Sequence, residues 1–186
     1  MRSAQMLNRS RSQKGFTLLE TMIALVVLAV GVLGLAAMLA NSLTYMQGSE
    51  QNFIAQQKAS EAIESIFTAR DTQAVTYAQI QNVSAGGIFL DGPANLVDPG
   101  LDGIVDTADD NAALPDTIIK PGPDGILGTA DDIKIVLSVY YKMQRTIVIS
   151  NIAGENGVRM IVVTVTYTTG SFTRTYTLTS YISQYS

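Results

Sequence analysis

The most prominent feature of the sequence is an apolar stretch near the N-terminus. Residues 21–49 contain no charged side chain, and residues 22–40 consist only of Ala, Val, Leu, Ile, Met and Gly. A helix of about 20 apolar residues spans the hydrocarbon core of a bilayer, and it satisfies its own backbone hydrogen bonds there. The pattern therefore predicts a membrane-spanning helix over residues 16–43.

Beyond residue 43 the pattern becomes that of a helix with one apolar face. Ala59, Ile63, Ile66 and Phe67 are spaced as i, i+4, i+7 and i+8, which places them on one side of a helix. We therefore expect the helix to continue over 44–70, with this stripe packed against a globular head.

The C-terminal part of the chain has the composition and period of β-strands. Segments 133–142, 144–150, 158–167 and 172–183 are rich in Val, Ile, Thr and Tyr, and Gly-containing turns follow the second and third of them. In the last segment, one face of the expected strand carries Phe172, Tyr176, Leu178 and Ile182, and the other face carries threonines. After an irregular segment over 71–132, we expect a four-stranded antiparallel sheet over 133–186 that packs on the helix. The expected fold class is α+β.

Two residue types that carry much of protein chemistry are absent. The sequence has no His and no Cys, which excludes Ser-His-Asp triads, cysteine nucleophiles, Cys/His zinc sites and disulfides. Because no other nucleophile and base stand out as a set, we expect that the protein is not an enzyme.

Charge is divided unevenly along the chain. The net charge is −4, but residues 1–15 hold four basic side chains and no acidic one. The acidic remainder argues against general nucleic-acid binding. The basic flank before the apolar stretch places the N-terminus in the cytoplasm and the rest of the chain outside it.

Two simpler explanations of the apolar stretch compete with a specialised one. A cleaved secretory signal has an apolar core of about 7–15 residues, so this stretch is too long for one. A plain membrane anchor fits, except that Glu20 lies inside the stretch. A carboxylate in lipid costs about 3 kcal/mol and marks a functional position, but Glu20 is equally compatible with a place at the headgroups near Lys14.

The residues around Glu20 decide between these readings. The sequence KGFTLLE at 14–20 resembles the cleavage and N-methylation motif of type IV prepilins and pseudopilins: a basic leader, Gly15, Phe16, a carboxylate at the fifth mature position and a long apolar helix. The resemblance extends through ALVVLAVGVLGLA at 24–36 and AQQKASEAIE at 55–64. This pattern is similar to PilV-type minor pilins and to minor pseudopilins of type II secretion.

The resemblance implies a processing and assembly pathway. Prepilin peptidase would remove residues 1–15 by cutting between Gly15 and Phe16, and would methylate the new amine of Phe16. Glu20 would accept that amine from a neighbouring subunit. The partners implied are other pilin or pseudopilin subunits, the bacterial inner membrane and its assembly platform. The head would lie in the periplasm until the subunit enters a pilus or pseudopilus.

The resemblance also ranks the possible roles of the protein. Major pilins usually carry a proline in the helix near Ala37, and all five prolines of this chain lie at 91–132. A minor pilin of a type IV pilus is therefore expected. The alternatives are a minor pseudopilin of a type II secretion system, and a membrane-anchored, calcium-dependent adhesive module.

The segment 91–132 contains an internal repeat that is rich in aspartate. PGLDGIVDTADD at 99–110 recurs as PGPDGILGTADD at 121–132, with nine of twelve positions identical. Asp-Gly turns bring carboxylates and carbonyls together, and Ca²⁺ takes six to eight such oxygens. The spacing does not fit an EF-hand, and a solvated acidic loop is the alternative. We predict a calcium site with candidate ligands Asp102, Asp106, Asp109, Asp110, Asp124, Asp131 and Asp132.

Overall fold

The computed structural model describes residues 15–185, so residues 1–14 of the predicted leader lie outside the described residues. The chain divides into two compact units, the first ending at Leu43 and the second beginning at Thr44. One helix, α1 (Leu18–Asp71), runs through both. Such a helix was expected, because residues 22–40 are an uninterrupted apolar run and the apolar residues between Ala59 and Phe67 keep a helical spacing.

In the first unit, the described part of α1 is uniformly exposed. Every described side chain from Gly15 to Leu43 faces solvent, and α1 is the one helix of the described chain that is long and apolar enough to cross a membrane. An apolar helix that buries nothing within its own chain needs lipid or other subunits around it. This unit therefore fits membrane anchoring.

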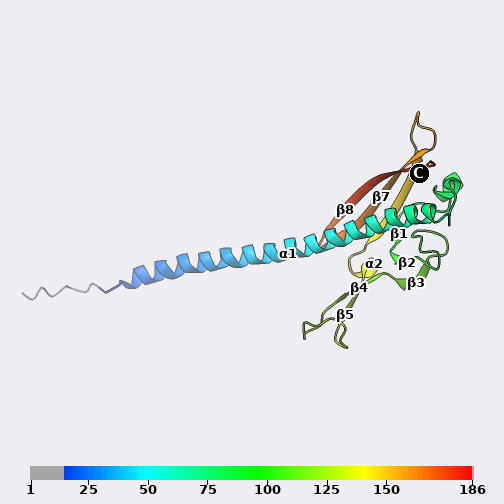
Figure 1. Cartoon of the computed structure of the whole chain (residues 1–186). Coiled ribbons are helices and arrows are strands. Elements are labelled where there is room, and N and C mark those ends of the chain that lie inside the picture. The colour runs from blue at the N-terminus through cyan, green and yellow to red at the C-terminus, as the bar shows by residue number, and fades with distance from the viewer. Residues whose placement is uncertain (1–14, 186) are drawn as a thin grey trace, which may run out of the picture. The chain divides into compact units, whose positions relative to one another are not determined.

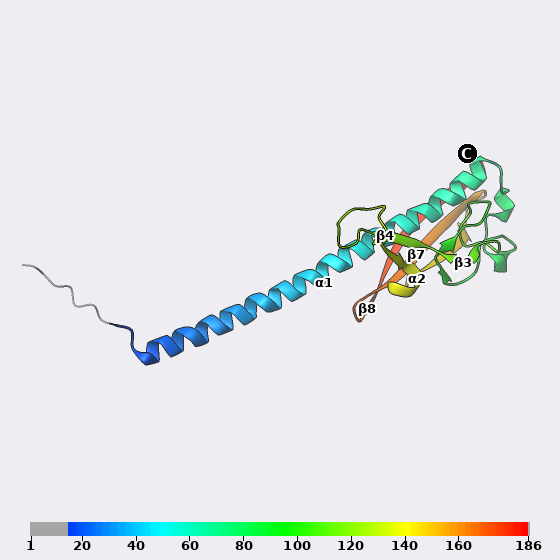
Figure 2. The same ribbon diagram turned by 90° about the horizontal axis from the view of Figure 1, so that it is seen from below.

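The second unit is built around a four-stranded antiparallel sheet in the order β1-β6-β7-β8. The strands are β1 (Ala94–Asn95), β6 (Gln144–Asn151), β7 (Val158–Thr169) and β8 (Phe172–Ser183). The outer part of α1 lies along β7 and β8 in both views (Figures 1 and 2). A long N-terminal apolar helix followed by a C-terminal antiparallel sheet confirms the predicted α+β, pilin-like arrangement.

Smaller elements fill the chain between α1 and the sheet. Two short 3₁₀ helices, η1 (Tyr77–Gln79) and η2 (Val83–Ala85), follow α1. Two separate antiparallel pairs come next, formed by β2 (Val97–Asp98) with β3 (Asn111–Pro115) and by β4 (Thr117–Lys120) with β5 (Ile133–Val136). Each pair encloses one copy of the aspartate-rich repeat, so the repeats form the tips of two hairpins.

The prediction of a strand over 133–142 within the main sheet was wrong. The segment forms β5, which pairs with β4, and then the short helix α2 (Leu137–Tyr140). Leu137 and Tyr141 are buried whereas Val139 and Tyr140 are exposed, which is the i, i+4 spacing of a helical turn rather than the alternation of a strand. The fourth strand of the main sheet is instead β1.

The buried face of α1 is close to the predicted stripe but turned slightly from it. Ala59 and Ile66 are fully buried, and Ile63 and Phe67 are partly buried at its edge. The face is completed by alanines at 55, 62 and 69. Small side chains let the helix approach the sheet closely, so the alanines that a hydrophobicity pattern weighs lightly are central to the contact.

Strand β8 confirms most of the predicted alternation. Ile182 is buried, Tyr176 and Leu178 are half-buried, and the threonines between them are exposed. Phe172 at the start of the strand is exposed, contrary to the prediction. It pairs with Thr169 beside the turn, beyond the part of the strand that packs on the core.

The outer edge of β6 is covered by one side chain. Asn82 Nδ2 donates to the carbonyl of Ile147 at 2.8 Å, and Asn82 Oδ1 accepts the Ile149 N–H at 2.8 Å. The amide thereby mimics a neighbouring strand where β1 has ended. Unpaired edge groups are liabilities in a buried setting, so Asn82 fastens the η1–η2 loop to the sheet.

Candidate functional site: the start of α1 and the aspartate repeats

The first candidate site is the start of α1. The helix begins at Leu18, and Phe16 just before it is exposed. Gly15 is also open, since a Cβ built there would meet no atom within 4 Å. The Gly15–Phe16 bond thus lies in non-helical, accessible chain, which is the form that a peptidase needs.

A threonine that the sequence analysis did not single out caps this helix. Thr17 Oγ1 accepts the Glu20 N–H at 3.2 Å, and the Thr17 carbonyl accepts the Thr21 N–H at 3.2 Å. Thr followed three residues later by Glu is the signature of a helix start, so the sequence contained the signal. Glu20 lies in the first turn, where the helix dipole favours a negative charge.

The second candidate site is the pair of aspartate repeats, whose two copies fold alike. Asp102 Oδ1 accepts the Ile104 N–H at 2.8 Å, and Asp124 Oδ1 accepts the Ile126 N–H at 2.8 Å. In each copy the last aspartate then closes the loop: Asp110 Oδ2 accepts the N–H of residue 106 at 2.8 Å, and Asp132 Oδ2 that of residue 128 at 2.7 Å. The repetition in sequence is therefore a repetition of a hydrogen-bonded loop.

A threonine hydroxyl ties each loop together. Thr107 Oγ1 lies 3.2 Å from the Ile104 carbonyl oxygen and 2.7 Å from Asp109 Oδ1, and its hydrogen can be donated to either acceptor. Thr129 Oγ1 stands in the same relation to the Ile126 carbonyl (3.1 Å) and Asp131 Oδ1 (2.6 Å). These bonds give a structural reason for the threonine and the two aspartates that both copies share.

The Pro-Gly at the head of each repeat allows the loop to close. A Cβ at Gly122 would lie 2.2 Å from the Asp131 carbonyl oxygen, and one at Gly100 would lie 2.9 Å from Asp109 Oδ2. Such distances leave no room for a side chain. Only glycine permits this approach of the two ends of the loop.

The environments of the two repeats differ. In the first, Asp106 and Thr107 are buried, and burial raises the pKa of Asp110 above its ordinary value, although bonds from the Asp106 and Thr107 N–H groups oppose this. In the second, the hydrogen bond from Thr129 lowers the pKa of Asp131. The same motif is therefore a core element in one copy and a surface loop in the other.

A buried ion pair fixes the first repeat to the sheet. Arg145 of β6 donates through Nε to Asp106 Oδ2 at 2.8 Å and through Nη2 to Asp106 Oδ1 at 3.1 Å. The side chains are 1% and 3% exposed. Arg145 Nη1 also donates to the Lys58 carbonyl of α1 at 3.3 Å. Arg145 was not predicted from the sequence, in which Gly128 at the position of Asp106 in the second repeat was the one available signal.

The predicted calcium ligands fall into two groups, one for each repeat. Asp106 is engaged by Arg145, and the other aspartates bond to backbone N–H groups or threonine hydroxyls of their own loop. Across residues 15–185 no three or more acidic side chains are grouped closely enough to hold a metal. Asp132 Oδ1 is buried without a hydrogen-bond partner. Calcium binding stays a prediction.

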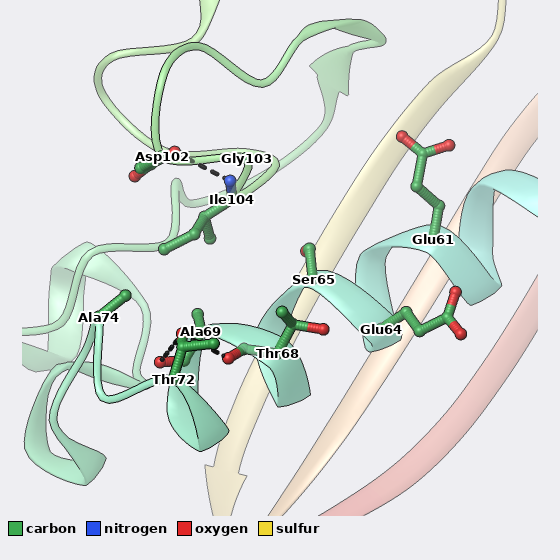
Figure 3. A pocket seen from close by; sticks show the side chains of 10 residues that line it. All are labelled: Glu61, Glu64, Ser65, Thr68, Ala69, Thr72, Ala74, Asp102, Gly103 and Ile104. Atoms are coloured by element: carbon green, nitrogen blue, oxygen red, sulfur yellow. Dashed lines mark hydrogen bonds between the residues drawn. The ribbon is translucent and has the colours of Figure 1, made fainter.

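A recess of about 400 Å³ lies between α1 and the first repeat. Figure 3 shows Glu61 and Glu64 at one end of it and Ile104 and Ala74 at the other. The two glutamate side chains point away from each other and from Asp102 (Figure 3). The recess is therefore acidic in composition but does not bring its carboxylates together.

Comparison with known proteins bears on the first site. Residues 10–36 match the family model described as the prokaryotic N-terminal methylation motif. The chain carries a type IV pilin-like N-terminus. No curated protein and no solved structure matches the chain.

The motif indicates the pilin and pseudopilin class, whose members are processed by prepilin peptidase and assemble with other such subunits. It points to a structural subunit rather than an enzyme. The match includes Gly15, Phe16 and Glu20 and ends within the apolar half of α1.

Proposed function

We propose that this chain is a minor pilin, incorporated into a type IV pilus or priming its assembly. The observation that carries the proposal is Glu20 in the first turn of an uninterrupted apolar helix, within the matched methylation motif. Prepilin peptidase cuts between Gly15 and Phe16 and methylates the Phe16 amine. The helix is thereby freed from the basic leader and can leave the membrane for the filament.

Glu20 gives this assembly its register. A carboxylate within an apolar bundle is costly unless an opposite charge neutralises it. In the chain itself the Glu20 side chain is exposed, and its backbone N–H is already used by Thr17. The carboxylate therefore accepts the methylated Phe16 amine of a neighbouring subunit, and only one axial offset between two helices brings the pair together.

The absence of proline from residues 16–43 supports a minor rather than a major subunit. The proposed role leads to a direct test in cells that form pili. Tagged wild-type chain should be recovered in filaments sheared from the cell surface. Glu20→Ala should be cleaved normally but remain in the membrane fraction, because its helix lacks the group that pairs with a neighbour's amine.

Glu64→Ala serves as the matched control, since Glu64 is an exposed glutamate of the same helix outside the apolar half. It should enter filaments like the wild type. Equal recovery of Glu20→Ala and wild-type chain in sheared filaments would remove the assembly role of Glu20. Absence of the wild-type chain from filaments, with the leader removed and the head folded, would reject the minor pilin.

A further inference from the structure

One end of the head carries exposed aromatic side chains. Phe172 at the start of β8 is 72% exposed, and Tyr140 at the end of α2 is 70% exposed. The β7–β8 turn and α2 lie at the same end of the sheet in both views (Figures 1 and 2), and the Thr168 N–H donates to the Tyr141 carbonyl between them at 2.8 Å. Large exposed rings gathered at one end of a domain mark a contact surface.

Hydrogen bonds and an ion pair hold this end of the head to one short stretch of α1. Thr169 Oγ1, beside the β7–β8 turn, donates to Gln51 Oε1. Lys120 at the end of β4 forms an ion pair with Glu50 at 2.5 Å. Tyr140 lines a recess of about 360 Å³ together with Glu50, Gln51 and Lys120. The two exposed rings therefore flank the stretch of α1 around Glu50.

This stretch of α1 follows the apolar segment directly. Residues 21–49 contain no charged side chain, and Glu50 is the first charged residue after them. At a rise of about 1.5 Å per residue, α1 extends about 10 Å from Leu43 to Glu50, which carries it through a headgroup layer. Aromatic rings are enriched at that depth because they are amphipathic. In a membrane-anchored chain, this end of the head is therefore the part that meets the membrane surface.

The exposed cations of the head gather at the same end. Lys134 lines the recess beside Glu50, Lys142 lies two residues after the end of α2, and Arg174 lies two residues after Phe172. All three are exposed, and within residues 15–185 their side chains form no ion pair and no hydrogen bond. The other basic side chains of the head are each engaged by a carboxylate or a backbone carbonyl.

This grouping of cations stands out because the rest of the head is acidic. Beyond residue 15 the chain holds twice as many acidic as basic side chains. The opposing charges on the adjoining hairpin are Asp124, Asp131 and Asp132, whose carboxylates accept hydrogen bonds within their own loop. Unpaired cations beside exposed aromatic rings match a surface that offers phosphate groups above an apolar layer, which is the chemistry of an anionic phospholipid bilayer.

We propose that this end of the head docks on the anionic phospholipid surface of the membrane that α1 crosses. The Phe172 and Tyr140 rings enter the layer between the headgroups and the acyl chains, and Lys134, Lys142 and Arg174 bind lipid phosphates. The contact holds the head against the membrane before assembly and breaks when the helix leaves the bilayer. It rests on the membrane anchoring of the chain and not on the kind of filament that the chain enters.

Tryptophan fluorescence tests the contact, because the natural chain has no tryptophan. Full-length Phe172→Trp and Tyr140→Trp variants are reconstituted separately in vesicles of phosphatidylglycerol and phosphatidylcholine with brominated acyl chains, since bromine quenches indole rings within the bilayer. Both variants should be quenched. Tyr185→Trp is the matched control, because Tyr185 is also an exposed aromatic residue but lies beside Gly157, at the opposite end of β7. It should not be quenched.

The role of charge is tested in the Phe172→Trp background. Each cation near an anionic surface contributes about fivefold to binding, so Lys134→Gln, Lys142→Gln and Arg174→Gln together should lower the ratio of docked to undocked head on the order of 100-fold. Quenching should then fall to the level of the Tyr185→Trp control. A charge-conserving variant with Arg at 134 and 142 and Lys at 174 should keep its quenching. Neither set should change the melting temperature, because the three side chains are exposed.

Two results would overturn the proposal. If Phe172→Trp and Tyr140→Trp are quenched no more than Tyr185→Trp, the head does not dock on the bilayer. If quenching stays the same when phosphatidylglycerol is replaced by phosphatidylcholine, anionic headgroups are not what this end of the head binds. The vesicles contain no other subunit, so either result leaves the minor pilin proposal intact. Conversely, absence of the chain from sheared filaments would not remove the membrane contact.

Discussion

Arg145 and Asp106 form a two-pronged ion pair in the core, with Nε–Oδ2 at 2.8 Å and Nη2–Oδ1 at 3.1 Å. The pair joins the first aspartate repeat to the central sheet, and Arg145 Nη1 extends the connection to the Lys58 carbonyl of α1. One arginine therefore links the three parts of the head. Asp106 has a φ of +58°, a backbone conformation that the pair helps to hold.

Removal of either partner should destabilise the head strongly. Arg145→Met or Asp106→Gly leaves one buried charge uncompensated, which typically costs about 3–5 kcal/mol in free energy of unfolding. The double variant Arg145→Met/Asp106→Gly, which gives the first repeat the glycine of the second, should lose much less than the sum. Denaturant unfolding of the full chain in detergent micelles measures all three.

Arg174→Met is the control for these variants, because Arg174 is exposed on β8; its effect should stay within about 0.5 kcal/mol. Additive losses in the double variant would show that the two side chains stabilise the head independently, and would contradict the account of the ion pair.

The two repeats offer a matched pair of threonines. Thr107→Val should lower the free energy of unfolding by about 1–3 kcal/mol, because it removes the hydroxyl that donates at the buried Ile104 carbonyl. Thr129→Val removes the same hydroxyl from an exposed loop and should cost less than about 1 kcal/mol, since water replaces it. Equal losses in the two variants would mean that burial does not distinguish the repeats.

Lys58 gives the head a dependence on alkaline pH. It bonds to Asp116 at 2.6 Å and to Glu61 at 2.7 Å. Burial lowers the pKa of Lys58, but the bonds to these two carboxylates outweigh burial and raise the pKa above 10.5. The stabilisation is therefore complete below pH 10.5 and is lost as the pH rises through the folded pKa.

Unfolding curves of the wild type and Lys58→Met between neutral pH and pH 12 test this assignment. The variant should be less stable by about 1 kcal/mol at neutral pH, and the difference should shrink above pH 10.5. Lys134→Met, at an exposed lysine of β5, should show no such convergence. A constant difference between wild type and Lys58→Met across the range would refute the role of the charge.

Calcium is tested by the melting temperature of the full chain in detergent, with the ion or with a chelator. If the repeats bind calcium, the ion should raise the melting temperature. Free ion at about 100 times its dissociation constant adds about 2.7 kcal/mol to the free energy of unfolding. Asp132→Asn should reduce the rise more than Asp116→Asn, which lies outside both repeats. Equal melting temperatures with and without the ion would remove calcium and leave the pilin proposal intact.

Periodicity predicted the parts of the fold that repeat a simple spacing. The helix, the order of its segments and three of the four long β segments follow from such spacing. The structure of segment 133–142 was not predicted, because the helix Leu137–Tyr140 has only four residues, which is too short to show a helical period in the sequence. The sequence-based prediction of the buried face of α1 also omitted the alanines at 55, 62 and 69, which are buried in the structure.

The sequence predicted the turns of the two repeats but not all the hydrogen-bond partners of their aspartates. The aspartates and glycines indicated tight turns, and the turns are present. The partner of Asp106 was not predictable from local pattern, since Arg145 lies 39 residues away along the chain. In the sequence, carboxylates that accept hydrogen bonds from backbone N–H groups and threonine hydroxyls cannot be distinguished from carboxylates that bind a metal ion.

Under the proposed function, Phe16 becomes a free, methylated N-terminus whose amine meets Glu20 of another subunit. The most direct measurement is the intact mass, with N-terminal peptide sequencing by mass spectrometry, of the chain purified from its native membrane or filament. We expect a chain that begins at Phe16 and carries one additional methyl group on its amine. A chain that still carries the residues before Phe16 would contradict it.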